Sequence, residues 1–436
     1  MSLHSHPAAT KILSGVALLH NFCFWGLASM FPLYATSRLE FSQALATSSY
    51  GLMLGVALAM PVLGGLVVSR LQSAAVPQQR VYIAQASLLF LGGASLLFLV
   101  PSPIFTVAGG LLLALGYGLF WPTVVAMVSD AYDARESSIS PRSKREDGFV
   151  IFYVVSTIGT FATQALAGLV VARLNWTGFY VMLALAAVTG TGVLALTTRH
   201  VATAASPNRA ASTREALSPH ERHRVFGVLL LALFCLVFWM GCSQMGGSVV
   251  FFAQNFVDRQ VFGWEAPPTL FLSMFALLVV ALTPVAAAVW RRLEERGVPQ
   301  SAPKKIAISI AFVSASFLVL SVAAQDLAPD DSQVVSASVL LSFYFLQAAA
   351  VAILGPVGLS MVTLWAPDGW VERLTGVWFF STGLGGLLGG YAAAASSHPP
   401  SSEYGAFAVV LGAAALGLFV TGQRIARLGP IKPAAR

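Results

Sequence analysis

The stretch RHVATAASPNRAASTREALSPHERHR (residues 199–224) is the longest polar interruption in an otherwise apolar sequence. It is rich in Ala, Ser, Pro and Arg, which is typical of a connecting segment. Apolar segments long enough to cross a bilayer lie on both sides of it, six before and six after. Their predicted ranges are 12–37, 44–69, 81–100, 103–129, 148–172, 176–198, 225–253, 268–290, 305–325, 334–365, 374–396 and 403–423. The sequence therefore predicts an all-α membrane protein with an N-terminal six-helix bundle (1–198), a linker (199–224) and a C-terminal six-helix bundle (225–436).

The composition supports a membrane protein and argues against several other classes. Hydrophobic residues make up 57% of the chain and charged residues only 10%, with a mean hydropathy of +0.77. A soluble domain carries about a quarter charged residues. The net charge of +7 comes from basic residues in short loops, so we attribute it to lipid headgroups and topology and not to nucleic acid. The three cysteines lie in apolar runs without metal-ligand spacing, and we expect them to pack in the core.

The distribution of charge predicts the topology. If both ends of the chain are cytoplasmic, 22 of the 25 Lys and Arg residues fall on the inner side, leaving Arg38, Arg173 and Arg259 outside. All 18 Asp and Glu residues fall in loops or at span ends, with Glu403 on the outer side. No carboxylate is then left for acid–base catalysis in the membrane, so we do not expect an enzyme. Two six-helix halves joined by a basic loop indicate the major facilitator architecture, with its site between the halves.

Several stretches resemble signatures of the proton-dependent oligopeptide transporter (POT) family of that superfamily. DGFVIFYVVSTIGTF (147–161) is similar to its F-Y-x-x-I-N-x-G signature, and VDRQVFGWEAPPTLFLSMFALLVVALTP (257–284) to its V-D-R…P pattern. GPVGLSMVTLWAP (355–367) and GVWFFSTGLGGLLGG (376–390) resemble its tenth and eleventh spans. The resemblance covers nearly the whole chain. It implies the major facilitator fold and transport by alternating access, without a cofactor.

The chain departs from this family at the family's charged positions. The second Glu and the Arg of the first-span motif E-x-x-E-R fall on His20 and Asn21. The fourth-span Lys falls on Trp121 and the Asn of the fifth-span signature on Thr157. Exchanging a buried charged pair together is physically sensible, because a single unpaired charge in a membrane is costly. The sequence therefore predicts a divergent member whose cavity holds no fixed charge.

Polar and aromatic residues on the cavity-facing spans are the candidate solute-binding residues. Aromatic-rich clefts with a few polar groups suit organic ligands, although a membrane Trp is also a common packing or interfacial residue. The candidates are His20, Asn21, Trp25, Trp121, Tyr153, Thr157, Gln164, Gln244, Ser248 and Trp378. His20 is also the candidate for proton coupling, because an ionisable group inside a span is a functional hypothesis by default. Its alternative interpretation is a neutral imidazole held by an interhelical hydrogen bond.

We interpret the sequence as a transporter of a peptide-like or other low-charge organic solute, without carboxylate-based proton coupling. Three alternatives stay open: proton-coupled di- or tripeptide uptake using His20, uncoupled facilitated diffusion, and a non-transporting receptor. The expected partners are the solute, the lipid bilayer and, in the coupled alternative, protons; no metal, cofactor or nucleic acid is expected. The Arg-rich, Ala-rich composition and short loops indicate a bacterial inner membrane, with both termini cytoplasmic.

Overall fold

The computed structural model describes the chain apart from residues 1–5, 72–77, 134–141, 203–216, 262, 299, 326, 328–333, 368–369, 396–399 and 430–436. The helices of the first half are α1 (Ala8–Arg38), α2 (Gln43–Ala59), α3 (Pro61–Leu71), α4 (Gln79–Leu97), α5 (Pro103–Asp133) and α6 (Arg142–Ala202). Those of the second half are α7 (Pro219–Cys242), the 3₁₀ turn η4 (Ser243–Gly246), α8 (Ser248–Phe256), α9 (Pro268–Glu295), α10 (Ala302–Ala323), α11 (Ala337–Trp365), α12 (Val371–Ala394) and α13 (Pro400–Ala426). Much of the predicted linker lies outside the described residues, and α6 and α7 extend into its two ends.

The longest helix, α6, consists of two spans that meet at Asn175. This residue has a φ of 58° and a ψ of −173°, which breaks the helix. Asn tolerates a positive φ better than most residues. Its Oδ1 accepts a hydrogen bond from the backbone N–H of Thr177 at 2.8 Å, which satisfies one of the free donors at the start of the second span. The chain thus turns from the fifth span into the sixth within one residue.

The second half begins with a well-defined helix start. Ser218 Oγ accepts a hydrogen bond from the Glu221 N–H, and the Glu221 carboxylate accepts one from the Ser218 N–H. This reciprocal pair is a capping box, and Pro219 at the first helical position needs no hydrogen-bond acceptor. The sequence signal S-P-H-E at the end of the predicted linker therefore fixes where α7 begins.

Twelve membrane spans can be identified in the described part of the chain. Ten helical segments are long and apolar enough to cross a membrane. One of them is α6, which contains two spans. The 24-residue α12 is not among the ten, and it runs beside α2 and α7 as a further span. The prediction of twelve spans is confirmed.

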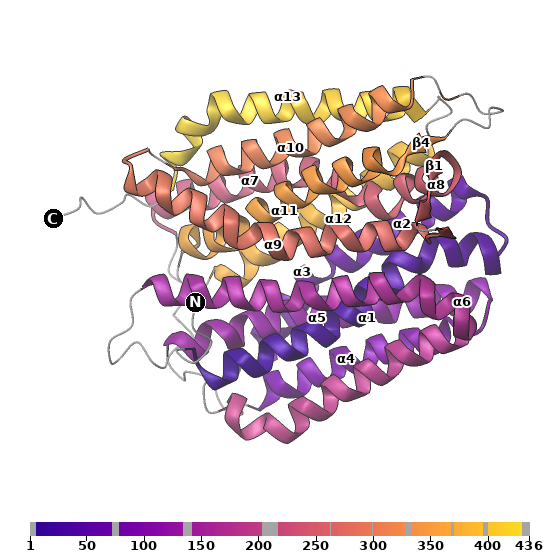
Figure 1. The fold of residues 1–436 in the computed structure, drawn as a ribbon. Coiled ribbons are helices and arrows are strands. Elements are labelled where there is room, and N and C mark those ends of the chain that lie inside the picture. The colour runs from indigo at the N-terminus through magenta and orange to yellow at the C-terminus, as the bar shows by residue number, and fades with distance from the viewer. Residues whose placement is uncertain are drawn as a thin grey trace.

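The spans form two bundles, each with its own core. Figure 1 shows α1–α6 (indigo to magenta) in one half of the molecule and α7–α13 (pink to yellow) in the other. Buried apolar side chains form two clusters that follow this division, with Phe251 of α8 as the one residue of the second half in the first cluster. The predicted six-plus-six arrangement is confirmed.

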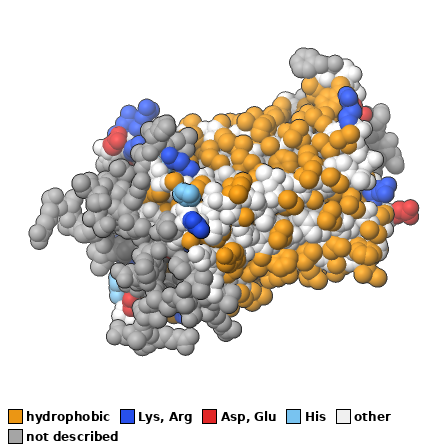
Figure 2. All heavy atoms as spheres, turned by 90° about the horizontal axis from the view of Figure 1, so that it is seen from below, with side chains coloured by type: hydrophobic (Ala, Val, Ile, Leu, Met, Phe, Trp, Pro, Cys, Tyr) orange, Lys and Arg blue, Asp and Glu red, His pale blue; other side chains and the backbone are white. Residues whose placement is uncertain are grey.

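The outer surface fits a membrane environment. Figure 2 shows a broad hydrophobic band, with the visible Lys and Arg side chains toward the two ends of the molecule. We call the end where α1 begins and α13 ends the termini end, and the opposite end the far end (Figure 1). The described ion pairs Arg80–Asp130 and Lys305–Glu294 belong to the termini end, and Arg259–Glu265 to the far end.

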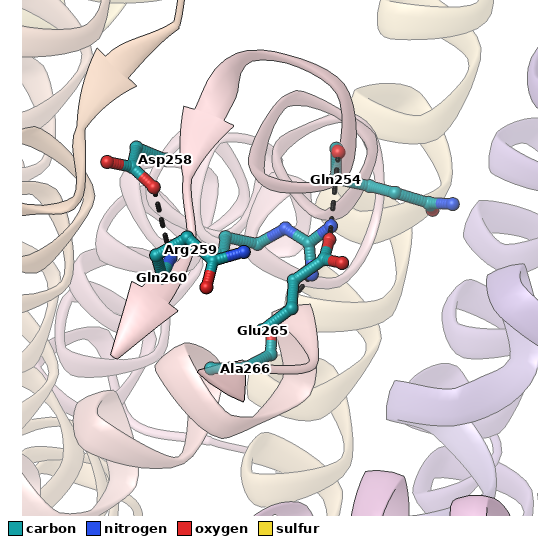
Figure 3. Close-up of polar contacts among 6 residues, drawn as sticks. All are labelled: Gln254, Asp258, Arg259, Gln260, Glu265 and Ala266. Carbon is teal, nitrogen blue, oxygen red and sulfur yellow. Dashed lines mark hydrogen bonds and ion pairs between the residues drawn. The ribbon is translucent and has the colours of Figure 1, made fainter. Parts of the chain in front are cut away.

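The far end carries short strands that the helical sequence pattern did not predict. β1 (Val257–Asp258) pairs in parallel with β4 (Val335–Ser336), and β2 (Gln260–Val261) pairs antiparallel with β3 (Trp264–Glu265). Figure 3 shows the Arg259 guanidinium reaching toward Glu265 and the Gln254 backbone. Arg259 also donates to the Ala266 carbonyl at 2.7 Å. These contacts tie the connection between α8 and α9 into a fixed loop.

The two bundles contact each other mainly where α12 packs on α2 and α3 and where α6 packs on α9. Glycines allow the close approach. A Cβ atom at Gly51 of α2 would lie 2.8 Å from the Cα of Gly390 in α12. A Cβ at Gly168 of α6 would lie 2.7 Å from Pro267, next to the start of α9. Small residues at helix interfaces are how membrane helices pack tightly without a hydrophobic driving force.

Candidate functional site

A central cavity lies between the two bundles. Its volume is about 170 Å³, and α1, α2, α5 and α6 of the first bundle line it together with α7, η4, α9, α11 and α12 of the second. The lining is mainly aromatic and aliphatic, with a few amide and hydroxyl groups. Among the described lining residues there is no Asp, Glu, Lys, Arg or His. Such a cavity fits an organic ligand that is held by apolar contact and neutral hydrogen bonds.

Seven of the ten predicted site residues come together in this cavity. They are Asn21, Trp25, Trp121, Tyr153, Thr157, Gln164 and Trp378. His20, Gln244 and Ser248 are not among the lining residues. Sequence reasoning missed several lining residues on the same spans, notably Ser29, Tyr50, Tyr117, Ser243 and Thr382. Their polar side chains within apolar spans were the available signal.

Three polar atoms of the cavity residues have no partner within the protein. They are Asn21 Oδ1, Gln164 Oε1 and the indole Nε1 of Trp121. The other end of the Asn21 amide donates from Nδ2 to the Ser156 carbonyl at 3.1 Å, which ties α1 to α6. Buried polar groups are normally hydrogen-bonded. Two free acceptors and one free donor are therefore available to a solute.

Two hydroxyl groups of the α6 wall are engaged with their own helix. Ser156 Oγ and Thr157 Oγ1 both donate to the Tyr153 carbonyl at 2.8 Å. The Tyr153 ring crosses to the second bundle, where a Cβ atom at Gly355 of α11 would lie 2.8 Å from its Cζ. The glycine therefore makes room for the tyrosine, and Tyr153 lines the cavity where the two bundles meet.

Aromatic rings from both bundles meet at the wall between α5 and α12. The Trp121 ring centroid lies 6.2 Å from that of Phe379, and the Tyr117 centroid lies 6.4 Å from it. Trp378 packs on α11, where a Cβ at Gly358 would lie 2.4 Å from its Cζ2. Rings at these separations interact favourably beyond their area burial.

His20 lies behind this aromatic wall. Its side chain is completely buried, and its ring stacks on Phe120 with a centroid distance of 3.8 Å. Tyr117 and Trp121, which line the cavity, also contact it. Neither ring nitrogen has a partner within hydrogen-bond geometry, although the Asn21 side chain and the Gly116 backbone lie close to the ring. The neighbouring residue Asn21 faces the cavity, because successive residues of a helix point about 100° apart.

Gln244 and Ser248 form a polar chain beside the cavity. Gln244 Nε2 donates to Ser243 Oγ and to the Met240 carbonyl, each at 3.2 Å. Ser248 Oγ donates to Gln244 Oε1 at 3.3 Å. Ser243 lines the central cavity, whereas Ser248 lines a second pocket at the far end.

Comparison with known proteins finds similarity to one family. The model of the POT family matches residues 206–410. The dipeptide and tripeptide permease B of Photorhabdus luminescens is 24% identical, in a match covering 99% of this chain and 97% of that protein. The peptide transporter YePEPT of Yersinia enterocolitica subsp. palearctica is 32% identical over 179 residues, which are 40% of this chain and 35% of that protein.

The family model, the relatives and the solved structures together support membership of the POT family. Solved structures agree in fold: a peptide transporter POT in complex with alafosfalin superposes with a TM-score of 0.81 at 19% identity, covering 99% of this chain and 97% of that one. A POT family transporter in complex with 5-aminolevulinic acid has a TM-score of 0.82 at 15% identity, covering 97% and 98%. The predicted family and major facilitator fold are confirmed.

The similarity to the POT family also bears on whether the chain is a transporter or an enzyme. The relatives that match over most of this chain are named permeases, and a permease moves a solute without transforming it. The prediction of a membrane transporter instead of an enzyme is therefore confirmed. Which residues of this chain contact the solute stays a prediction.

Proposed function

We propose that this chain moves a peptide-like or other low-charge organic solute across the membrane by alternating access of its two bundles. The observation that carries the proposal is the central cavity, whose described lining offers aromatic rings and neutral polar atoms but no charged side chain. Charge-assisted hydrogen bonds to the ends of a zwitterionic peptide have no protein partner there. A solute with masked or absent terminal charges fits this cavity better.

The relatives support the peptide-like character of the solute. Several are dipeptide and tripeptide permeases, and one solved relative is in complex with a thioalcohol-conjugated peptide. An amide backbone also matches the free groups of the cavity, because its N–H groups can donate to Asn21 Oδ1 and Gln164 Oε1. Its carbonyl can accept from the Trp121 indole. We propose that Trp25, Tyr153, Thr157 and Trp378 also contact the solute.

Proton-coupled uptake through His20 is the second candidate function. One observation favours it: both ring nitrogens are buried without a partner, and unsatisfied buried groups often mark function. The aromatic rings that separate His20 from the cavity support the simpler proposal, in which the solute does not touch it. Gln244 and Ser248 contribute indirectly, through their hydrogen bonds to the cavity wall.

We further propose that the termini end faces the cytoplasm of a bacterial cell and that the bundles divide at the 199–224 linker. The charge pattern supports this orientation, because Arg38, Arg173 and Arg259 are the only basic residues expected at the far end. Labelling of a cysteine introduced at the exposed Gln260 by a membrane-impermeant maleimide in intact cells tests it.

Counterflow in proteoliposomes tests the solute class. The probe pair is a dipeptide of two aromatic residues with free termini and the same dipeptide with an acetylated N-terminus and an amidated C-terminus. We expect the capped form to exchange with an affinity at least about tenfold higher, or about 1.4 kcal/mol. Trp121→Lys should reverse this preference by placing an ammonium in the cavity wall. Trp264→Lys, at an exposed far-end position, is the matched control and should leave it unchanged.

The possible results separate the open alternatives. Strong accumulation of the free dipeptide driven by a proton gradient would contradict the proposal and favour coupled peptide uptake. Exchange without accumulation under any gradient identifies facilitated diffusion. Absence of exchange and of any ligand-dependent thermal shift across a panel of peptides and apolar solutes identifies a non-transporting receptor.

A further inference from the structure

A second pocket lies at the far end, on the boundary between the bundles. Its volume is about 210 Å³, and its walls come from α2 of the first bundle and from α8, α12 and α13 of the second. Asn255 Nδ2 of α8 donates to Gln43 Oε1 of α2 across this boundary at 3.5 Å. Because the walls belong to both bundles, separation of the bundles at the far end opens this pocket to water.

Glu403 is the one carboxylate among the described residues that line this pocket. The charge pattern placed it at the boundary of the last span, but α13 begins three residues earlier, at Pro400, and puts Glu403 in its first turn. Its Oε1 is buried and has no hydrogen-bond partner. The first turn of a helix favours a negative charge electrostatically. No donor there forms a hydrogen bond with Glu403 Oε1, however.

The described side chains around Glu403 are neutral. The described wall from α2 consists of Gln43, Ala44 and Thr47, and that from α12 of Ala393 and Ala394. The α8 wall has only Ser248 and Asn255 as polar residues. On α13, Tyr404 is the other titratable side chain of the described lining, and no Lys, Arg or His contributes to it. An ionised carboxylate can only accept hydrogen bonds, whereas a protonated one is neutral and can donate.

Ser248 connects this carboxylate to the central cavity. Its side chain lies beside Glu403 and Tyr404, but its single hydroxyl hydrogen goes to Gln244 Oε1. Gln244 in turn donates to Ser243, which lines the central cavity. The amide is tightly held, since a Cβ atom at Gly389 would lie 2.6 Å from its Nε2. A serine has one hydrogen to donate, so it cannot serve Gln244 and an ionised Glu403 together.

We propose that Glu403 is a proton-binding site that controls closure of the far end. In the closed state the carboxyl is protonated, and Ser248 donates to Gln244 as observed. When the far end opens, the O–H bond of Glu403 breaks, the proton passes to water at that end, and Ser248 turns toward the carboxylate. The hydrogen bond to Gln244 is then lost, and the cavity wall at Ser243 loosens. This inference rests on the alternating access proposed above.

The proposal gives a quantitative expectation. One proton is taken up per closure, so the ratio of closed to open molecules can change by at most about tenfold per pH unit. Acid on the far side favours the closed far end and, with it, a cavity that faces the termini end. Proton binding thus acts without any charged group in the central cavity.

Electron–electron distance measurements on spin-labelled protein in lipid nanodiscs test this without a solute. The labels are attached at Ser37→Cys and Gln260→Cys, both exposed at the far end on opposite bundles, while the three native cysteines are buried. We expect the open fraction to rise between pH 5 and pH 8 in the otherwise native chain. Glu403→Gln should stay closed over the whole range. Glu40→Gln removes an exposed carboxylate of the same end and should respond as the native chain does.

Each result decides the proposal. A Glu403→Gln chain that responds to pH like the native chain overturns it, as does a native chain with no response. Glu403→Asp keeps a titratable group and should retain a response with a displaced midpoint, so the proposal stays testable if Glu403→Gln does not fold. If Glu403→Gln weakens the exchange of amine-bearing solutes but leaves the pH response intact, the pocket binds ammonium and the proton proposal is wrong. Because the distance measurement uses no solute, a negative result there concerns the Glu403 proposal alone. A negative result in counterflow concerns the proposed solute class.

Discussion

Gln347 in the second bundle and His20 in the first are both completely buried polar residues, but their environments differ. Gln347 Oε1 accepts from the Cys242 thiol at 3.1 Å, and its Nε2 donates to Ser316 Oγ at 3.0 Å. It therefore links α11 to α7 and α10. His20 is surrounded by aromatic rings, and neither of its nitrogens has a partner.

The difference distinguishes buried polar side chains that hold helices together from buried polar side chains that are free to bind a ligand or a proton. A buried amide with both ends bonded holds helices together, and removing it leaves its partners unsatisfied. A buried ring without hydrogen bonds contributes to stability through packing and not through polar interactions. Asn21 is intermediate, with Nδ2 bonded to α6 and Oδ1 free in the cavity. The three residues predict three different mutational outcomes.

Gln347→Leu should have the largest effect on stability. It removes the amide that accepts a hydrogen bond from the Cys242 thiol and donates one to the Ser316 hydroxyl, in a buried site. We expect the free energy of unfolding to fall by about 1–3 kcal/mol, measured by thermal unfolding in detergent. Ser342→Ala removes an exposed hydroxyl from the same helix and should change stability by less than about 0.5 kcal/mol. Equal effects of the two changes would contradict a linking role for Gln347.

Asn21→Leu should affect solute binding more than folding. It removes one hydrogen bond to the Ser156 carbonyl and the free acceptor in the cavity. We expect a loss of about 1 kcal/mol in stability and a roughly fivefold to tenfold weaker solute affinity in counterflow. Ser14→Ala on the same helix loses a comparable bond, to the Thr10 carbonyl, away from the cavity. An unchanged solute affinity in Asn21→Leu would remove Asn21 from the binding site.

The spans and their grouping could be predicted from sequence because they depend on composition alone. Apolar length places each helix, but it predicts the start of α7 at residue 225, whereas the cap formed by Ser218 and Glu221 begins the helix at Pro219. The resemblance of the fifth, tenth and eleventh spans to POT family signatures pointed to the right family. Tyr153 and Trp378 on those spans line the cavity. These features are local or are repeated along the chain.

The finer features depend on contacts that no local pattern encodes. His20 and Asn21 are adjacent, and only the rotation of α1 decides that Asn21 faces the cavity. The turn at Asn175 replaces a loop because its side chain caps the next span. The strand pair β1–β4 joins loops that are far apart in sequence. The burial of Glu403 Oε1 follows from the meeting of α2, α8, α12 and α13, which charge counting cannot reveal.

His20→Phe should have the smallest effect, and it tests the comparison most sharply. Phenylalanine keeps the stacking on Phe120 and removes two nitrogens that have no partner within hydrogen-bond geometry. We expect the free energy of unfolding to change by less than about 1 kcal/mol in either direction, because no hydrogen bond is lost. We also expect the pH profile of counterflow to keep its shape, measured between pH 5 and pH 8. A flattened profile would assign proton coupling to His20 and make its unpaired nitrogens functional. A large loss of stability would instead show that the imidazole is held by a hydrogen bond, and the contrast with Gln347 would disappear.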